Sequence, residues 1–205
     1  MSERFNRALQ LAMFVHGRQI RKETHNAHDI PLPYITHPVT VATLVQRYDG
    51  TEDQIIGGLL HDVLEDGGAQ WAGPIRSEFG DGVLQIVEFC TDGIPDALGK
   101  KAPWETRKRE YLEHLRQTDG PGLLVSACDK LANLEAIVLD LIEHGETVWN
   151  RFTATKGQSL WYYGELVKAF AGRVPKPLAA SLHRTFEQVR AEARGAATDE
   201  PLTGV

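Results

Sequence analysis

The chain has 205 residues, of which 42% are hydrophobic, and its formal net charge at pH 7 is −6. This length suits one domain of ordinary size with a sizeable core. The negative charge excludes a broad basic field for nucleic acid, so any anionic ligand needs a local group of Lys and Arg or a bound cation.

Targeting and redox signals point to the cytoplasm. No apolar run is long enough to cross a bilayer, and the first residues lack the core of a signal peptide. Cys90 and Cys128 stand in apolar helical segments and do not form a metal-type pair. Buried free thiols in a reducing compartment are therefore expected, and no membrane partner is predicted.

Hydrophobic residues recur at helical spacing along almost the whole chain. Helices are predicted over 3–22, 37–48, 51–66, 73–79, 82–92, 103–117, 123–143, 148–172 and 176–194. A polar, proline-containing loop is predicted over 23–36, and a loop with Gly, Pro and two lysines over 91–102. There is no convincing β-alternation and no internal repeat. The sequence therefore predicts an all-α fold, with one compact domain over 1–195 and a frayed tail over 196–205.

The third predicted helix carries the most informative residues. His61 and Asp62 are adjacent and can turn toward one cation, and Glu65 and Asp66 follow one helical turn later. The flanking residues are apolar nearly all round the helix, which is typical of a buried helix. Because buried charges must be paired or bind metal, the segment predicts a metal site with two carboxylates beside it. The alternative is a solvated acidic helix end.

Three other segments contain isolated polar residues. His37 opens the second predicted helix, where a capping or surface role is the alternative to metal binding. Asp129 interrupts an apolar run, and Asn133 follows one turn later. Both could cross-link helices; beside a metal, Asp129 could be a ligand and Asn133 could hold substrate or water. His16, on an apolar helix face, is expected to be a satisfied core histidine.

Six short segments occur in a characteristic order: Arg21-Lys22, Pro33-Tyr34-Ile35-Thr36-His37-Pro38, Leu60-His61-Asp62-Val63-Leu64-Glu65-Asp66, Phe79-Gly80, Thr91-Asp92 and Asp129-Lys130-Leu131-Ala132-Asn133-Leu134. As an ordered set they resemble the HD-domain phosphohydrolases. Within these they look like the (p)ppGpp hydrolase branch, which comprises the small alarmone hydrolases and the hydrolase half of bifunctional Rel proteins. The resemblance covers roughly residues 5–170.

The resemblance implies a single HD-type domain with one metal ion per chain, usually manganese in this family. Zinc or iron could also bind two imidazoles and two carboxylates. The implied metal ligands are His37, His61, Asp62 and Asp129. The implied catalytic pair is Glu65 and Asp66, and the implied substrate contacts are Arg21, Lys22 and Asn133.

The implied reaction is hydrolysis of the 3′-diphosphate of guanosine tetra- or pentaphosphate (ppGpp, pppGpp), which gives GDP or GTP plus pyrophosphate. A cation that lowers the pKa of bound water would provide the nucleophile. One alternative is an HD phosphohydrolase for another phosphorylated nucleotide, such as NADPH. Another is a non-catalytic nucleotide-binding helical module, although a pure binder would not need both Glu65 and Asp66. The sequence indicates no oligomeric state.

A polyanionic substrate needs further cations. Lys108 in the run 107–109 is one candidate, and Lys156, together with Arg151, is another; Tyr163 could stack on a base. The alternative is that these residues form solvated helix faces. The family often reads Lys-Leu-Ala before the last ligand Asp, whereas this chain has Ser126-Ala127-Cys128. A basic residue near the metal is therefore either missing or supplied from elsewhere.

Overall fold

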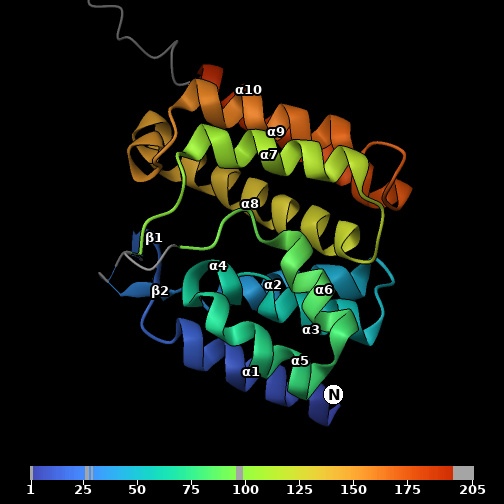
Figure 1. Cartoon of the computed structure of the whole chain (residues 1–205). Coiled ribbons are helices and arrows are strands. Elements are labelled where there is room, and N and C mark those ends of the chain that lie inside the picture. Colours follow the sequence, from blue (N-terminus) through green and yellow to red (C-terminus); the bar gives the residue numbers. More distant parts are fainter. Residues whose placement is uncertain (1, 26–27, 29, 96–98, 196–205) are drawn as a thin grey trace, which may run out of the picture.

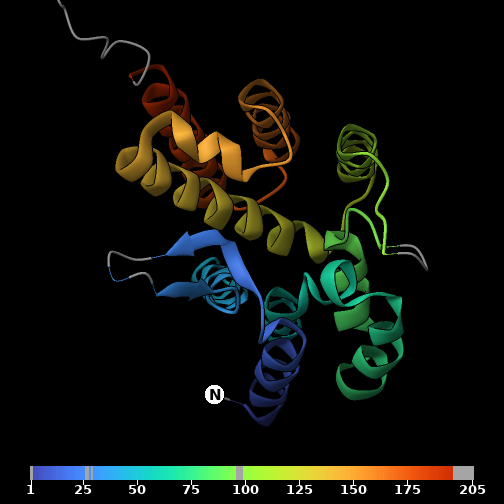
Figure 2. The ribbon, with the colours of Figure 1, turned by 90° about the vertical axis from the view of Figure 1, so that its left-hand side faces the viewer.

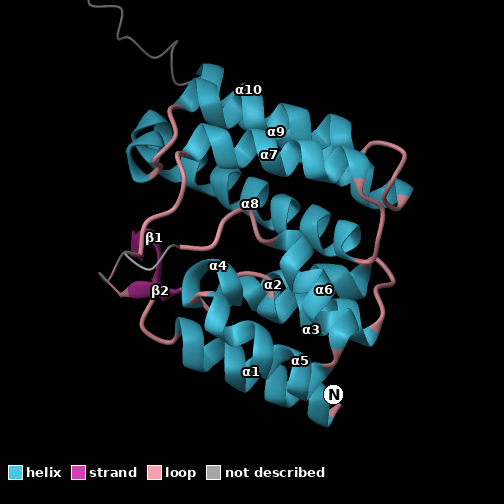
Figure 3. Cartoon of the chain, viewed as in Figure 1, coloured by secondary structure: helices cyan, strands magenta, loops and turns pink. Residues whose placement is uncertain are grey.

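The computed structural model arranges its helices in two groups with one long helix, α8, between them (Figures 1 and 3). It describes residues 2–25, 28, 30–95 and 99–195, so the tail predicted over 196–205 lies outside the described residues. The helices are α1 (Glu3–His16), α2 (Thr36–Arg47), α3 (Glu52–Leu60), α4 (Val63–Gly67), α5 (Ala72–Phe79), α6 (Asp81–Cys90), α7 (Trp104–Gln117), α8 (Gly122–His144), α9 (Lys156–Phe170) and α10 (Lys176–Gly195). The other elements are β1 (Ile20–His25), β2 (Pro31–Pro33), η1 (Ala69–Trp71) and η2 (Gly145–Arg151).

Helix α8 is the central element of the fold. It packs against α2, α3 and α6 on one side and against α9 and α10 on the other, and Figure 2 shows it crossing between the two groups. One hydrophobic cluster lies mainly among α1, α3, α5 and α6, and a second joins α8 to α7, α9 and α10. A polar residue in the middle of α8 therefore lies at the boundary between the two cores.

Most of the predicted helices are confirmed. The observed bounds of α2, α5, α6, α7, α8 and α10 lie within two residues of the predicted ones. The described helices dominate the fold, as the all-α prediction requires. None of them combines the length and the apolar composition that crossing a membrane would need.

The prediction for the first helix is wrong at its end. The helix stops at His16, and the chain forms strand β1, which pairs antiparallel with β2 so that Ile20 lies opposite Pro33. The Tyr34 backbone N–H donates to the Gln19 carbonyl over 2.9 Å. Helical periodicity does not report such pairing, because the pairing depends on a second segment beyond the turn. As a result, Arg21 lies on a strand rather than at a helix end.

The helix predicted over 51–66 is interrupted at the His-Asp pair. Thr51 and Gln54 form a reciprocal capping box at its start, as N-cap chemistry favours. The helix ends at Leu60, and Asp62 has φ −96° and ψ 0°, the bridge conformation of tight turns and many active-site residues. A second short helix, α4, then carries Glu65 and Asp66.

The helix predicted over 148–172 starts late. The short helix η2 ends at Arg151, Phe152 is extended, and α9 begins at Lys156. A capping box between Thr155 and Gln158 fixes that start, because it satisfies two backbone N–H groups that a helix N-terminus leaves open. The non-helical segment from Phe152 to Thr155 therefore joins η2 to α9.

Two glycines let α3 pack closely against its neighbours. A Cβ on Gly58 would lie 3.1 Å from the Ala42 Cα on α2, and a Cβ on Gly57 would lie 2.4 Å from the Ile86 Cγ2 on α6. A side chain at either position would force these helices apart. The close approach of α2 and α3 brings His37, near the start of α2, beside His61 at the end of α3.

Candidate active site

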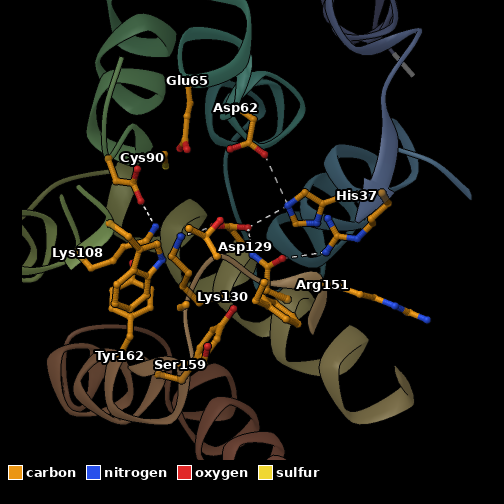
Figure 4. Close-up of a pocket in the computed structure, with 18 of the residues that line it drawn as sticks. His37, Asp62, Glu65, Cys90, Lys108, Asp129, Lys130, Arg151, Ser159 and Tyr162 are labelled. Atoms are coloured by element: carbon orange, nitrogen blue, oxygen red, sulfur yellow. Dashed lines mark hydrogen bonds and ion pairs between the residues drawn. The ribbon is translucent and has the colours of Figure 1, made fainter. Parts of the chain in front are cut away.

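The four predicted metal ligands lie close together, and Figure 4 shows three of them, His37, Asp62 and Asp129. His37 Nε2 lies 3.0 Å from Asp129 Oδ1 and 3.8 Å from Asp62 Oδ2. His61 Nε2 lies 3.0 Å from Asp62 Oδ2 and 3.6 Å from Asp129 Oδ1. The donor atoms of His37, His61 and Asp129 all lie within 4.8 Å of one another, so these three buried side chains could hold a metal ion. Asp62 is within reach of both imidazoles.

The orientation of His61 suits a cation. Its Nδ1 lies 2.8 Å from the Gly58 carbonyl oxygen, an acceptor, so Nδ1 carries the proton and donates. Its Nε2 is buried and has no hydrogen-bond partner among the described residues. A ring N–H bound to a backbone carbonyl is the arrangement that fixes metal-ligating histidines, with the other nitrogen left to bind. The donor set therefore fits a metal ion.

The electrostatics of the cluster also favour a cation. Burial lowers the pKa of His37 to about 4, which leaves its imidazole neutral at pH 7. Burial also lowers the pKa of His61, but Asp62 and Asp129 outweigh it and the net shift is upward. Burial would raise the pKa of Asp129, yet Lys130 and the two histidines hold it well below its usual range. The pKa of Asp62 is also lowered, because the effect of His61 outweighs the opposing effect of burial. Both carboxylates stay ionised at neutral pH.

The basic residue beside the predicted metal ligands is Lys130, which directly follows Asp129. Its Nζ lies 2.6 Å from Asp129 Oδ2. Burial lowers the pKa of Lys130, but Asp129 and two nearby tyrosines outweigh burial and hold the pKa well above the usual lysine value. Ser126, where the family often has lysine, is buried and shares a 2.7 Å hydrogen bond with the Tyr111 hydroxyl. Lys130 was visible in the sequence as a lone lysine in an apolar run. Its role could not be inferred without knowing that α8 is buried on both sides.

Tyr34 is a further residue at the metal site. Its hydroxyl donates to Asp62 Oδ2, and its ring lies 5.8 Å from the ring of His37 and 4.9 Å from the ring of His16. His16 is buried, and its Nδ1 pairs with Gln19 Oε1 at 2.7 Å. The prediction that His16 is a satisfied core histidine is confirmed for its burial but not for its Nε2, which has no hydrogen-bond partner among the described residues. Tyr34 belongs to the segment Pro33-Tyr34-Ile35-Thr36-His37-Pro38, but the sequence alone indicates no role for its hydroxyl.

A cavity of about 370 Å³ opens above this cluster, a size within the range of ligand pockets. Its described lining carries four carboxylates and four cations. The carboxylates are Asp62, Glu65, Asp92 and Asp129, and the cations are Arg21, Lys108, Lys130 and Arg151. Aromatic walls come from Tyr34, Trp104, Phe152, Tyr162 and Tyr163. Because the eight charges cancel, a bound divalent cation would leave the cavity positive, as a polyanionic ligand requires.

The predicted catalytic carboxylates have different surroundings. Glu65 lines the cavity, whereas Asp66 does not and lies 3.9 Å from His16 Nδ1. Burial, then Asp92 and Asp62, raise the pKa of Glu65 against the opposing effect of Lys101. Burial, Asp62 and Glu65 raise the pKa of Asp66 to about 7. Carboxyl groups with raised pKa values can hold or release a proton near neutral pH.

The structure brings most of the predicted substrate contacts to the cavity. Arg21 is buried, and its Nη2 donates to Asn133 Oδ1 over 2.8 Å, while Asn133 Nδ2 donates to Asp129 Oδ1 over 2.6 Å. Lys108 pairs with Asp92 in the cavity wall, and Tyr163 also lines it.

Of the other two predicted substrate contacts, Lys156 is found elsewhere, and the prediction for Lys22 stays untested. Lys156 does not line the cavity; its Nζ pairs with Glu146 at 2.7 Å and donates to the Ala193 carbonyl. It connects η2, α9 and α10, a position that charge patterning along one helix cannot reveal. The side chain of Lys22 lies outside the described residues.

The two cysteines are free and buried, as predicted. Burial, then Asp129, raise the pKa of the Cys128 thiol to about 12, and the pKa of Cys90 is raised mainly by burial as well. Neither thiol is therefore activated as a nucleophile.

We expect metal to stabilise the fold measurably. At a concentration one hundredfold above the dissociation constant, a ligand that binds only the folded state adds about 2.7 kcal/mol. For a domain of this size each kcal/mol raises the melting temperature by about 2–4 °C. Adding Mn²⁺ to chelator-treated protein should therefore raise the Tm by about 5–10 °C in a thermal-shift measurement. Asp129→Asn is the control, and an equal rise in that variant would contradict the site.

Comparison with known protein families identifies the family of this chain. The HD domain family matches residues 8–159, and the chain belongs to that family.

Two similar proteins share the name MESH1. The guanosine-3′,5′-bis(diphosphate) 3′-pyrophosphohydrolase MESH1 of Xenopus tropicalis is 34% identical over 129 residues, which cover 62% of this chain and 65% of the frog protein. MESH1 of Mus musculus is 28% identical over 183 residues, 88% of this chain and 92% of the mouse protein. The match thus spans just under two thirds of the first relative and nearly all of the second.

A solved structure is also similar. It is described as a metazoan ortholog of SpoT that hydrolyzes ppGpp and plays a role in starvation responses. The two folds superpose with a TM-score of 0.72 at 26% sequence identity, over 92% of this chain and 96% of that one. The structural similarity therefore extends over both helical groups of this chain.

Proposed function

We propose that this protein hydrolyses the 3′-diphosphate of ppGpp and pppGpp, releasing pyrophosphate and GDP or GTP. The observation that carries the proposal is the cluster of His37, His61, Asp62 and Asp129 at the base of a cavity whose wall includes Glu65. A cation site, a cavity-facing carboxylate and a charge-balanced lining are the parts that a metal-dependent attack of water on a phosphoryl group requires. The named activity of the MESH1 relatives and of the SpoT ortholog supports the choice of nucleotide.

The proposed ligands are His37, His61, Asp62 and Asp129, and the proposed ion is Mn²⁺, because two imidazoles with two carboxylates suit a hard or borderline cation. When bound, the cation supplies a Lewis acid that lowers the pKa of water and offsets phosphate charge. Tyr34 holds the Asp62 carboxylate, and Lys130 holds the Asp129 carboxylate. Both hydrogen bonds keep the carboxylates turned toward the imidazoles.

Glu65 and Asp66 are proposed to orient the attacking water and to move its proton. Glu65 lines the cavity and is the group that can meet water there. Asp66 lies outside the cavity lining, and burial, Asp62 and Glu65 raise its pKa to about 7. A raised pKa suits a group that accepts a proton and then returns it to the leaving 3′-oxygen.

Substrate binding is proposed for Arg21, Asn133, Lys108 and Tyr163. The guanidinium of Arg21 lies 6.0 Å from the centre of the Tyr34 ring and beside Asn133, so it can meet the nucleoside next to the cation site. Lys108 is paired with Asp92 and can meet a phosphate oxygen from the opposite wall. Tyr163 offers a ring to the base. The proposed catalytic domain spans 1–195, because α10 packs on α8 and α9.

The direct test is incubation of the protein with ppGpp and Mn²⁺, followed by separation of the products. We expect GDP and pyrophosphate in equal amounts, and no reaction in chelator. NADPH under the same conditions tests the alternative substrate through release of inorganic phosphate. Turnover of NADPH with no turnover of ppGpp would contradict the proposed substrate.

We expect Arg21→Ala to raise KM more than it lowers kcat. The side chain borders the cavity and contacts Asn133 rather than a proposed metal ligand, so its loss should remove binding that is equal in the ground and transition states. Loss of a charged hydrogen bond is worth about 1.5–3 kcal/mol, or roughly ten- to a hundredfold in KM. Steady-state kinetics with ppGpp measures both constants.

Arg190→Ala is the control, because Arg190 pairs with Glu187 on the exposed face of α10. An unchanged KM in the Arg21 variant would show that other cavity cations bind the nucleotide. A lowered kcat at constant KM would instead place Arg21 in the chemical step.

A further inference from the structure

The loop between α6 and α7 contains a lysine that the proposed reaction does not use. Lys101 Nζ lies 2.9 Å from Glu65 Oε1 and 3.7 Å from Asp66 Oδ1. One ammonium group therefore faces both carboxylates of the proposed catalytic pair. Glu65 is part of the described cavity lining and Lys101 is not, so Lys101 reaches Glu65 from outside the cavity.

Arg107 on α7 fixes this loop at both ends. Its guanidinium pairs with Asp92 near the start of the loop, and its Nε donates to the Ala102 carbonyl, next to Lys101, over 3.1 Å. The side chains of Asp92 and Arg107 are only 4% and 13% exposed. The contact with Asp92 joins two charged, largely buried groups and is therefore strong, and the contact with Ala102 holds the backbone next to Lys101.

The contacts of Glu65 leave one oxygen available. Lys101 approaches Oε1, and Arg107 Nη1 lies 3.9 Å from the same oxygen. Oε2 is then the oxygen that remains to face water, and Figure 4 shows the Glu65 side chain directed into the ring of labelled cavity residues. Proton transfer needs the carboxylate within hydrogen-bond reach of the water and correctly oriented.

Without the Lys101 contact, the Glu65 side chain would be free to turn away from the water. Asp62 and Asp92 repel Glu65 and raise its pKa, whereas Lys101 opposes both. Without the ammonium, Glu65 would lose the contact that sets its rotamer against this repulsion. A displacement of about 1 Å at a catalytic group can cost about a hundredfold in rate.

We propose that Lys101 is a positioning residue for the hydrolysis: it holds Glu65 Oε1 so that the second oxygen meets the attacking water. This inference rests on the proposed function. It assigns Lys101 no contact with substrate, because the cations in the cavity wall are other residues, among them Arg21 and Lys108.

The test compares Lys101→Met and Lys101→Arg with the wild type, at saturating Mn²⁺ and with ppGpp varied. Lys168→Met is the control, because Lys168 makes an ion pair of 2.7 Å with Glu165 on an exposed face of α9. We expect Lys101→Met to lower kcat by about ten- to a hundredfold with KM nearly constant. Lys101→Arg should recover most of kcat, since it restores a cation beside Oε1. The melting temperature of each variant should match that of the wild type.

Three results would overturn the inference while the wild type remains active. They are an unchanged kcat in Lys101→Met, a raised KM at constant kcat, which would make Lys101 a substrate contact, and a Lys101→Arg variant as slow as Lys101→Met. Failure of the proposed function has a different signature, because the wild type itself would then release no pyrophosphate. That result would overturn both proposals.

Discussion

Asp62→Ala protein is expected to bind metal more than about a hundredfold more weakly than the wild type and to lose nearly all hydrolysis. Even residues that only orient metal ligands are worth about 10- to 100-fold in metal affinity, and Asp62 lies 3.0 Å from His61 Nε2 and 3.8 Å from His37 Nε2. The same change removes the acceptor of the Tyr34 hydroxyl. Elemental analysis after dialysis against Mn²⁺ measures the effect directly.

Asp119→Ala is the matched control, because Asp119 is 88% exposed and pairs only with Arg173 among the described ion pairs. The control should keep one metal ion per chain. Wild-type metal content in Asp62→Ala would show that Asp62 is not needed as a ligand. The site would then be reduced to His37, His61 and Asp129.

Glu65→Gln is expected to lower kcat by about 10²–10⁴-fold, the usual worth of general acid–base assistance. The substitution keeps the size of the side chain and removes its ability to take a proton. Glu65 is not among the proposed metal ligands, so metal content should stay at one ion per chain. Single-turnover measurement with ppGpp separates the chemical step from product release.

Asp66→Asn provides the comparison, because its carboxylate lies outside the cavity lining. A smaller loss than in Glu65→Gln would assign proton transfer to Glu65, and an equal loss would show that the two carboxylates act together. A fall in kcat of less than about tenfold in both variants would remove the pair from the chemistry.

Helical periodicity determined most of the fold because it is a local property. The apolar stripes of α2, α5 to α8 and α10 each reflect the burial of one face of one helix. The His-Asp pair in an apolar helix predicted a cation site for a similar reason, since buried charge must be compensated. The other proposed ligands, His37 and Asp129, came from the order of the family's motifs. Their mutual distances became known only from the packing of α2, α3 and α8.

What local patterns could not provide was any contact between distant segments. Arg21 lies beside Asn133 because β1 pairs with β2, a pairing that helical spacing does not report. Lys156 pairs with Glu146 and contacts the end of α10, whereas Lys108, predicted from the same kind of signal, lines the cavity. Lys101, in the loop between α6 and α7, meets Glu65 on α4, and Arg107 holds the neighbouring Ala102 carbonyl. The sequence by itself predicted which residues carry the proposed chemistry. The tertiary structure decided their orientation and partners, because side-chain electrostatics depends on distances between segments far apart in the chain.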